Sequence, residues 1–164
     1  MSMPPSGNAM PRYDNYAAAD APPTILVVDD EPALLRLMEF LLKRQGYNLV
    51  TATNGEEALL KLREHRPDLM VLDIMMPKMD GYEVTERLRA DPDTSLAATP
   101  ILMLSAKAQD EDIVRGLRAG SEAYVTKPFD PELLTNAVAA MLRGEAIPEA
   151  PNVTQTRREE HPAA

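Results

Sequence analysis

Five short apolar runs, separated by stretches with helical spacing, constrain the fold of this chain most. The runs are rich in Val, Ile and Leu and occupy residues 25–28, 49–52, 69–72, 101–104 and 124–126. Continuous apolar runs of this length are typical of strands buried on both faces of a parallel sheet. The stretch after the first run carries Leu34, Met38 and Leu41 at helical spacing. This alternation predicts an α/β fold, a parallel five-stranded sheet with helices on both faces.

Polar residues of a particular kind follow four of the five runs. The first, third, fourth and fifth runs lead into Asp29-Asp30, Asp73, Ser105 and Lys127. The second leads only into a plain turn at Asn54-Gly55. Ligands of an open parallel sheet bind beyond the carboxyl ends of its strands, so the polar residues after the four runs are expected to meet in one cleft.

The chemistry of this set favours phosphoryl transfer to a carboxylate. Three carboxylates held close together raise one another's pKa unless a cation compensates. Oxygen ligands suit Mg²⁺, and a nearby lysine and hydroxyl suit the oxygens of a phosphoryl group. A single Asp after a strand is usually a turn or cap residue, so the interpretation depends on the whole set.

Length and composition predict one folded domain with two tails. The chain has 164 residues, enough for one domain with a sizeable core. Residues 1 to 23 and 144 to 164 are rich in Pro and polar residues, which predicts disorder in both segments. The folded domain is therefore expected to span residues 24 to 143.

Charge and residue usage argue against several classes of protein. The net charge is −9, and the Lys and Arg residues are scattered, so direct nucleic-acid binding is not expected. The chain has no Cys, which excludes disulfides and thiolate metal sites. No apolar run approaches the ~20 residues of a membrane span, and no signal peptide is evident. These features predict a cytoplasmic protein without membrane insertion.

Four motifs resemble those of the receiver domains of two-component response regulators. They are Val27-Val28-Asp29-Asp30-Glu31-Pro32, Leu72-Asp73-Ile74-Met75-Met76-Pro77-Lys78-Met79-Asp80-Gly81, Leu104-Ser105-Ala106 and Tyr124-Val125-Thr126-Lys127-Pro128-Phe129. The resemblance covers about residues 24 to 143. It implies a flavodoxin-like (βα)5 fold with strand order 2-1-3-4-5.

The resemblance also implies a role for each residue of the set. Asp73 would accept the phosphoryl group from a histidine kinase or phosphotransfer protein. Asp30 and Asp73 would bind Mg²⁺ directly, together with the backbone carbonyl of Met75, and Asp29 would act through water. Lys127 would pair with the phosphoryl group.

Two further roles concern the change that follows phosphorylation. Ser105 would hydrogen-bond to the phosphoryl group, and Tyr124 would be the aromatic switch that turns inward when Ser105 moves. A half-buried strand residue is the commoner role for a tyrosine, so the switch depends on the place of Tyr124 three residues before Lys127. The Lys127-Pro128 peptide bond would be cis.

The expected function is that of a stand-alone receiver whose phosphorylation switches binding to a downstream protein. Only 21 residues follow Arg143, too few for a DNA-binding domain. Such a protein assists its own phosphorylation and dephosphorylation but is not an enzyme with a separate substrate. The alternatives are a phosphorylation-independent adaptor, which has no need of the acid cluster, and a small-molecule phosphatase, which would need a cap over its substrate.

The expected assembly is a monomer. Some DNA-binding response regulators dimerise through the last strand and the helices on either side of it, here expected at about residues 110–119 and from Asp130 on. They typically have an acidic residue just before the switch aromatic and an arginine midway along the last helix. Here those positions are Ala123 and Ala137, so that salt bridge cannot form. Glu122 and Arg143 leave one weaker pairing.

Overall fold

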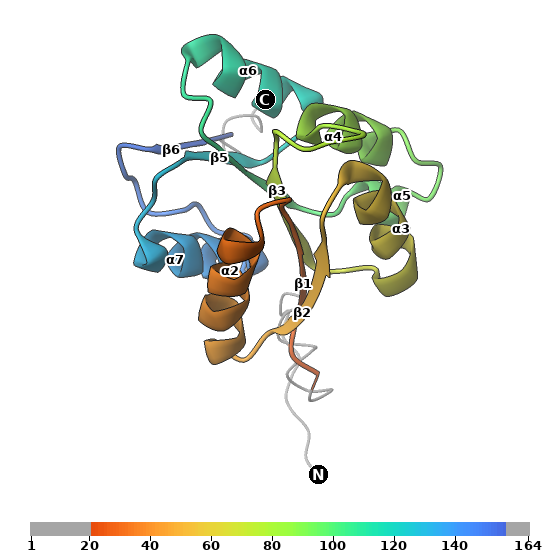
Figure 1. The fold of residues 1–164 in the computed structure, drawn as a ribbon, viewed down its shortest axis with the longest axis horizontal. Helices are drawn as coiled ribbons and strands as arrows, with labels where there is room; N and C mark the ends of the chain where they lie inside the picture. The colour runs from red at the N-terminus through yellow and green to blue at the C-terminus, as the bar shows by residue number, and fades with distance from the viewer. Residues whose placement is uncertain (1–20, 157–164) are drawn as a thin grey trace.

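A six-stranded sheet forms the centre of the computed structural model, which describes residues 21–156 (Figure 1). The strand order is β2-β1-β3-β4-β5-β6. The strands are β1 (Thr24–Val28), β2 (Asn48–Ala52), β3 (Leu69–Asp73), β4 (Ile101–Ser105), β5 (Ala123–Thr126) and β6 (Val153–Gln155). The first five are parallel and have the predicted order, which confirms the flavodoxin-like fold. The sixth pairs with β5 in the antiparallel direction.

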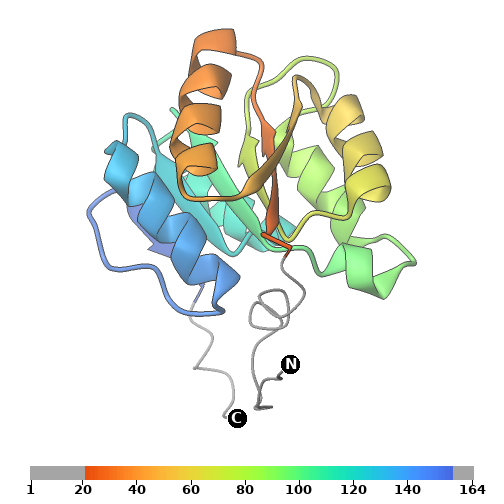
Figure 2. The ribbon, with the colours of Figure 1, turned by 90° about the horizontal axis from the view of Figure 1, so that it is seen from below.

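Helices cover both faces of the sheet. They are α2 (Pro32–Arg44), α3 (Gly55–His65), α4 (Gly81–Arg89), α5 (Thr94–Ala97), α6 (Asp110–Ala119) and α7 (Pro131–Leu142). Figure 2 shows α2 and α7 together on one side of the sheet and α3 and α4 on the other. The five long helices fall where helical spacing predicts them. The single turn of α5 was not predicted.

Successive side chains of β1 point to opposite faces of the sheet and belong to two separate core layers. Ile25 and Val27 pack with the helices α2 and α7, whereas Leu26 and Val28 pack with α3 and α4. All four side chains have no exposed surface. Burial on both faces explains why the strands read as continuous apolar runs in the sequence.

Local signals begin the helices next to the sheet's carboxyl edge. Pro32 occupies the first turn of α2, where the missing N–H is not needed. The side chains of Asn54 and Asp80 accept hydrogen bonds from backbone N–H groups at the starts of α3 and α4, and Asp130 does the same for α7. These caps fix where each loop of the carboxyl edge ends.

The prediction that residues 144 to 164 are disordered is wrong for residues 144–156. Ile147 is 2% exposed and packs against the core layer of α7, and Val153 to Gln155 form β6. The Gln155 side chain bonds to both the N–H and the carbonyl of Ile147, at 2.8 and 2.9 Å. These long-range contacts order a segment whose local composition is that of a tail.

Residues 1–20 and 157–164, which belong to the two predicted tails, lie outside the described residues. Between residues 21 and 156, no helix is long and apolar enough to cross a membrane.

Candidate functional site

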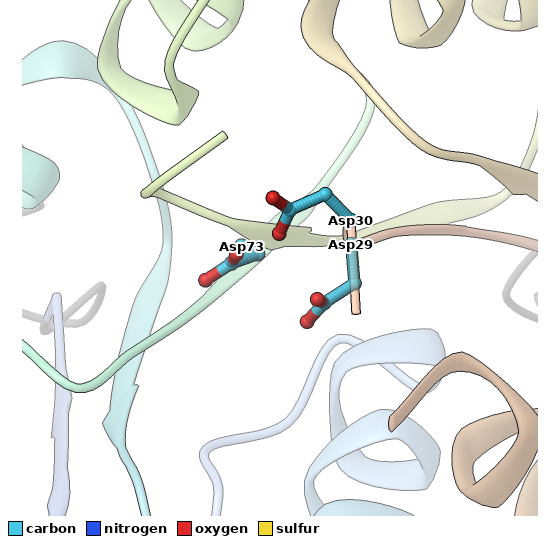
Figure 3. Close-up of side chains that lie close together, drawn as sticks. All are labelled: Asp29, Asp30 and Asp73. Atoms are coloured by element: carbon cyan, nitrogen blue, oxygen red, sulfur yellow. The ribbon is translucent and has the colours of Figure 1, made fainter. Parts of the chain in front are cut away.

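Three carboxylates converge at the carboxyl ends of two neighbouring strands. Asp29 and Asp30 directly follow β1, and Asp73 is the last residue of β3. One oxygen of each carboxylate lies within 4.8 Å of the others. Asp29 and Asp73 are 1% and 5% exposed, whereas Asp30 is open to solvent. Figure 3 shows the three side chains gathered at this edge of the sheet.

Lys127 supplies the positive charge of the cluster. It follows β5, and its Nζ lies 3.3 Å from Asp73 Oδ1 and 3.5 Å from Asp29 Oδ2. The Asp29 carboxylate also accepts a hydrogen bond from the Glu31 N–H at 2.9 Å. Two acids, a lysine and a backbone donor thus share one network, in which the lysine charge and the donor limit the cost of burying the two carboxylates.

Burial has the largest effect on the pKa of each of the two buried acids, Asp73 and Asp29. It raises the pKa of Asp73 to about 6, and the charge of Asp29 adds to this effect. It also raises the pKa of Asp29, against the opposing influence of the Glu31 hydrogen bond and of Lys127. One lysine therefore does not fully compensate this cluster, and a second cation would hold both acids in their charged form.

Ser105 and Tyr124 form a second network on the neighbouring strands β4 and β5. The Ser105 Oγ accepts a hydrogen bond from the Lys107 N–H at 3.1 Å, and the Tyr124 hydroxyl donates to the Lys107 carbonyl at 2.9 Å. The Ser105 hydroxyl also hydrogen-bonds to Tyr124. Both side chains have no exposed surface, so the structure places Tyr124 in the inward position.

Two residues that surround Tyr124 were not predicted as part of the site. Gly116 of α6 faces the ring, and a Cβ at this position would lie 2.8 Å from Tyr124 Cδ2. Tyr82 of α4 belongs to the same core layer as Tyr124, donates to the Asp112 carbonyl at 3.2 Å and lies under the Arg115 guanidinium, 3.9 Å from its ring centre. The sequence gives no signal for these partners because α4 and α6 approach β5 only in the fold.

The remaining predictions for the site have different outcomes. The Lys127-Pro128 peptide bond is cis, as expected. Met75 lies in the loop after β3 with its side chain 57% exposed. The role expected for its carbonyl stays a prediction.

The donor set fits a hard divalent cation. All three acids offer carboxylate oxygens, one of them open to solvent, which suits an ion that keeps some of its water. A cation here and the Lys127 ammonium would face the Asp73 carboxylate together. That arrangement can stabilise a phosphoryl group on Asp73.

A family profile described as "response regulator receiver domain" matches residues 25–139. The chain belongs to this family. The match contains the five parallel strands of the receiver domain and the residues Asp29, Asp30, Asp73, Ser105 and Lys127.

Known relatives agree with this assignment. The alkaline phosphatase synthesis transcriptional regulatory protein PhoP of Bacillus subtilis is 47% identical over 123 residues, which are 75% of this chain and 50% of PhoP. The crystal structure of a putative response regulator from Chloroflexus aurantiacus is 36% identical, with a TM-score of 0.69 over 74% of this chain and 98% of that one.

A third similar structure is the CheX-CheY-BeF3-Mg²⁺ complex from Borrelia burgdorferi. It is 26% identical, with a TM-score of 0.69 over 76% of this chain and 92% of that one. The receiver chain spans about half the length of the curated relatives that it matches.

Proposed function

We propose that this receiver domain accepts a phosphoryl group on Asp73 and thereby switches its binding to a downstream protein. The observation that carries the proposal is the position of Lys127 Nζ, 3.3 Å from the buried Asp73 carboxylate, inside a cluster of three acids. The phosphodonor would be a histidine kinase or a phosphotransfer protein. The protein would act in the cytoplasm without binding nucleic acid through this domain.

The chemistry divides between Asp73 and its neighbours. An oxygen of the Asp73 carboxylate attacks phosphorus, and the bond to the donor's leaving group breaks with its electron pair. Asp30, Asp73 and the Met75 carbonyl would hold Mg²⁺ directly and Asp29 would hold it through water, and the ion would supply positive charge to the transferred group. Lys127, whose Nζ lies 3.3 Å from the Asp73 carboxylate, would hold a phosphoryl oxygen and so limit the charge developed in the transition state.

The response to phosphorylation would begin at Ser105. Its hydroxyl can turn from the Lys107 N–H toward a phosphoryl oxygen, which changes the hydrogen bonds of Tyr124. Tyr124 lies on β5, and its hydroxyl holds the loop before α6, so a change there alters the surface formed by these elements. The reaction acts on the protein itself, and no separate substrate is proposed.

Binding of beryllofluoride, a mimic of a carboxyl-bound phosphoryl group, tests this proposal. We expect calorimetry to show binding only when Mg²⁺ is present, and we expect Asp73→Asn to abolish it. Asp110→Asn, which changes an exposed acid in the first turn of α6, is the matched control and should bind as wild type does. Equal binding by wild type and Asp73→Asn would contradict the assignment of Asp73.

The rival function is that of an adaptor which binds its partner without phosphorylation. Such a protein would give the same amide NMR spectrum at Tyr124 and Lys107 with and without beryllofluoride. The switch proposed here requires shifts at both residues. The buried and incompletely neutralised acids favour the switch, because an adaptor gains nothing from them.

A further inference from the structure

The segment after α7 returns to the sheet and brings Asn152 beside the phosphoryl site. Ile147 anchors the segment in the core, and Gln155 closes it through two hydrogen bonds to the Ile147 backbone. The antiparallel pairing of β6 with β5 then fixes its register, with Val153 opposite Val125. Asn152 therefore has a defined place at the end of β5.

Asn152 bonds to the backbone on both sides of Lys127. Its carbonyl accepts a hydrogen bond from the Thr126 N–H at 3.0 Å. Its side-chain Nδ2 donates to the Thr126 carbonyl at 3.0 Å and reaches the Pro128 carbonyl at 3.4 Å. One asparagine thus ties together the two residues that flank the lysine.

The Lys127 backbone is held from the other side as well. Its N–H donates to the Ser105 carbonyl of β4 at 2.8 Å. Lys127 is consequently fixed between β4 and Asn152, while its side chain extends to Asp29 and Asp73. Fixing a long lysine side chain on binding a phosphoryl group costs conformational entropy. That loss is smaller when the Lys127 backbone is already held in place.

We infer that Asn152 is a positioning residue for the phosphoryl site, which acts by fixing the backbone from which Lys127 reaches the phosphoryl group. This inference rests on the proposed function. Asn152 lies beyond residues 25–139, so the receiver family match does not include it. Within residues 21–156, the bonds of Asn152 go to the Thr126 and Pro128 backbone and not to an acid, so its loss should weaken phosphoryl binding through Lys127 without weakening metal binding.

The test compares two ligands on the full chain. Asn152→Ala should weaken beryllofluoride binding at saturating Mg²⁺ by about three- to tenfold, the range expected for losing a net hydrogen bond. The affinity for Mg²⁺ alone should not fall, because Asn152 and Lys127 are not among the proposed metal ligands. A purely structural role would leave both affinities as they are or lower both together, and either result would overturn the inference.

Two further variants keep the result interpretable. Thr154→Ala changes an exposed side chain of β6, two residues after Asn152, and this variant should bind both ligands as wild type does. Ile147→Ala keeps the Asn152 residue but loosens the segment that positions it, and it should weaken beryllofluoride binding without lowering the Mg²⁺ affinity. If wild type itself fails to bind beryllofluoride with Mg²⁺, the proposed function falls; wild-type binding with an unaffected Asn152→Ala overturns this inference alone.

Discussion

Asp73 makes the protein less stable when its carboxylate is charged and no cation is bound. Its pKa is about 6 in the folded protein, against 3.8 ordinarily, so the folded state holds the proton more tightly than the unfolded state. The stability contributed by that proton is complete below pH 3.8 and is lost as the pH rises through about 6.

Removing this charge should stabilise the metal-free protein. We predict that Asp73→Asn raises the free energy of unfolding at pH 7.5 by about 1–3 kcal/mol, the size that follows from a shift of this magnitude. Urea unfolding in the presence of EDTA measures it. The gain should shrink at pH 4.5, where wild type is protonated, and with Mg²⁺, which stabilises the wild-type carboxylate. A gain that is independent of pH would contradict burial of the charge as its cause.

Two side chains near Asp73 and Ser105 are expected to prolong the phosphorylated state. In the receiver family, the positions two residues after the acceptor and two after Ser105 tune loss of phosphate, and polar or acidic residues there favour rapid loss. Here they are Met75 and Lys107. Met75 is 57% exposed near the acceptor and offers no useful hydrogen bond to orient water, and Lys107 can hold a phosphoryl oxygen electrostatically.

We predict a phosphorylated state with a longer lifetime than that of the fast chemotaxis regulators. The double variant Met75→Asn with Lys107→Glu should lose phosphate about tenfold faster, a modest effect for an oriented water. Decay is measured after removal of the phosphodonor. Unchanged or slower decay would show that these side chains do not set the lifetime.

At the scale of elements, the contact between α6 and β5 depends on Gly116. A Cβ added there would lie 2.8 Å from both Tyr124 Cδ2 and Met103 Sδ. Glycine in a helix interior lowers the stability of the helix, so the sequence alone would make Gly116 only a destabilising residue. The fold shows its use: the missing side chain leaves room for the Tyr124 ring.

We predict opposite effects of Gly116→Ala in two backgrounds. In wild type, the clash with the ring, about 1–3 kcal/mol, should exceed the helix gain of about 1 kcal/mol, so the variant is less stable. In a Tyr124→Ala background the clash with the ring is gone and the flexible Met103 side chain can move into the space that the ring occupied, so the same change should stabilise. Urea unfolding of wild type, the two single variants and the double variant measures the coupling between Gly116 and Tyr124. Equal effects of Gly116→Ala in both backgrounds would contradict the packing argument.

Prediction from sequence succeeded for elements whose signals are local. The apolar runs predicted the five parallel strands, and Pro32 and the Asp130-Pro131 pair are local sequence signals that stand at the starts of α2 and α7. Sequence-based prediction failed for β6, a strand of three residues that begins two residues after Pro151. That strand exists because Ile147 reaches the core and Val153 pairs with β5, and neither partner is visible in the local sequence.

The same distinction applies to the site. Asp29, Asp30, Asp73 and Lys127 were predictable because strand ends of a parallel sheet must converge. Asn152 was not, since its segment resembles a tail.

At the scale of the whole molecule, the monomer stays a prediction, and the structure gives the surroundings of the residues on which it rests. Ala123 and Ala137 are buried, and β6 covers the outer edge of β5. The weaker pairing that the sequence leaves open is engaged within the chain: Glu122 binds Arg89 at 3.0 Å, and Arg143 binds Glu145 at 2.9 Å.

We therefore predict that this receiver stays monomeric with Mg²⁺ and beryllofluoride. Light scattering at concentrations up to the order of 100 μM, where a tight dimer of standard interface size would form, checks this. A dimer through β5 and α7 would require displacement of β6, and its appearance on activation would count against the account.

Covalent phosphorylation tests the central claim most directly. Incubation with acetyl phosphate and Mg²⁺, followed by intact-mass and peptide mass spectrometry, should show one added phosphate, located on Asp73. EDTA should prevent the addition, and Asp73→Ala should remain unlabelled, with Asp110→Asn as the folded control. Labelling of Asp73→Ala at the wild-type rate, or equal labelling in EDTA, would contradict the proposed phosphoacceptor and its metal.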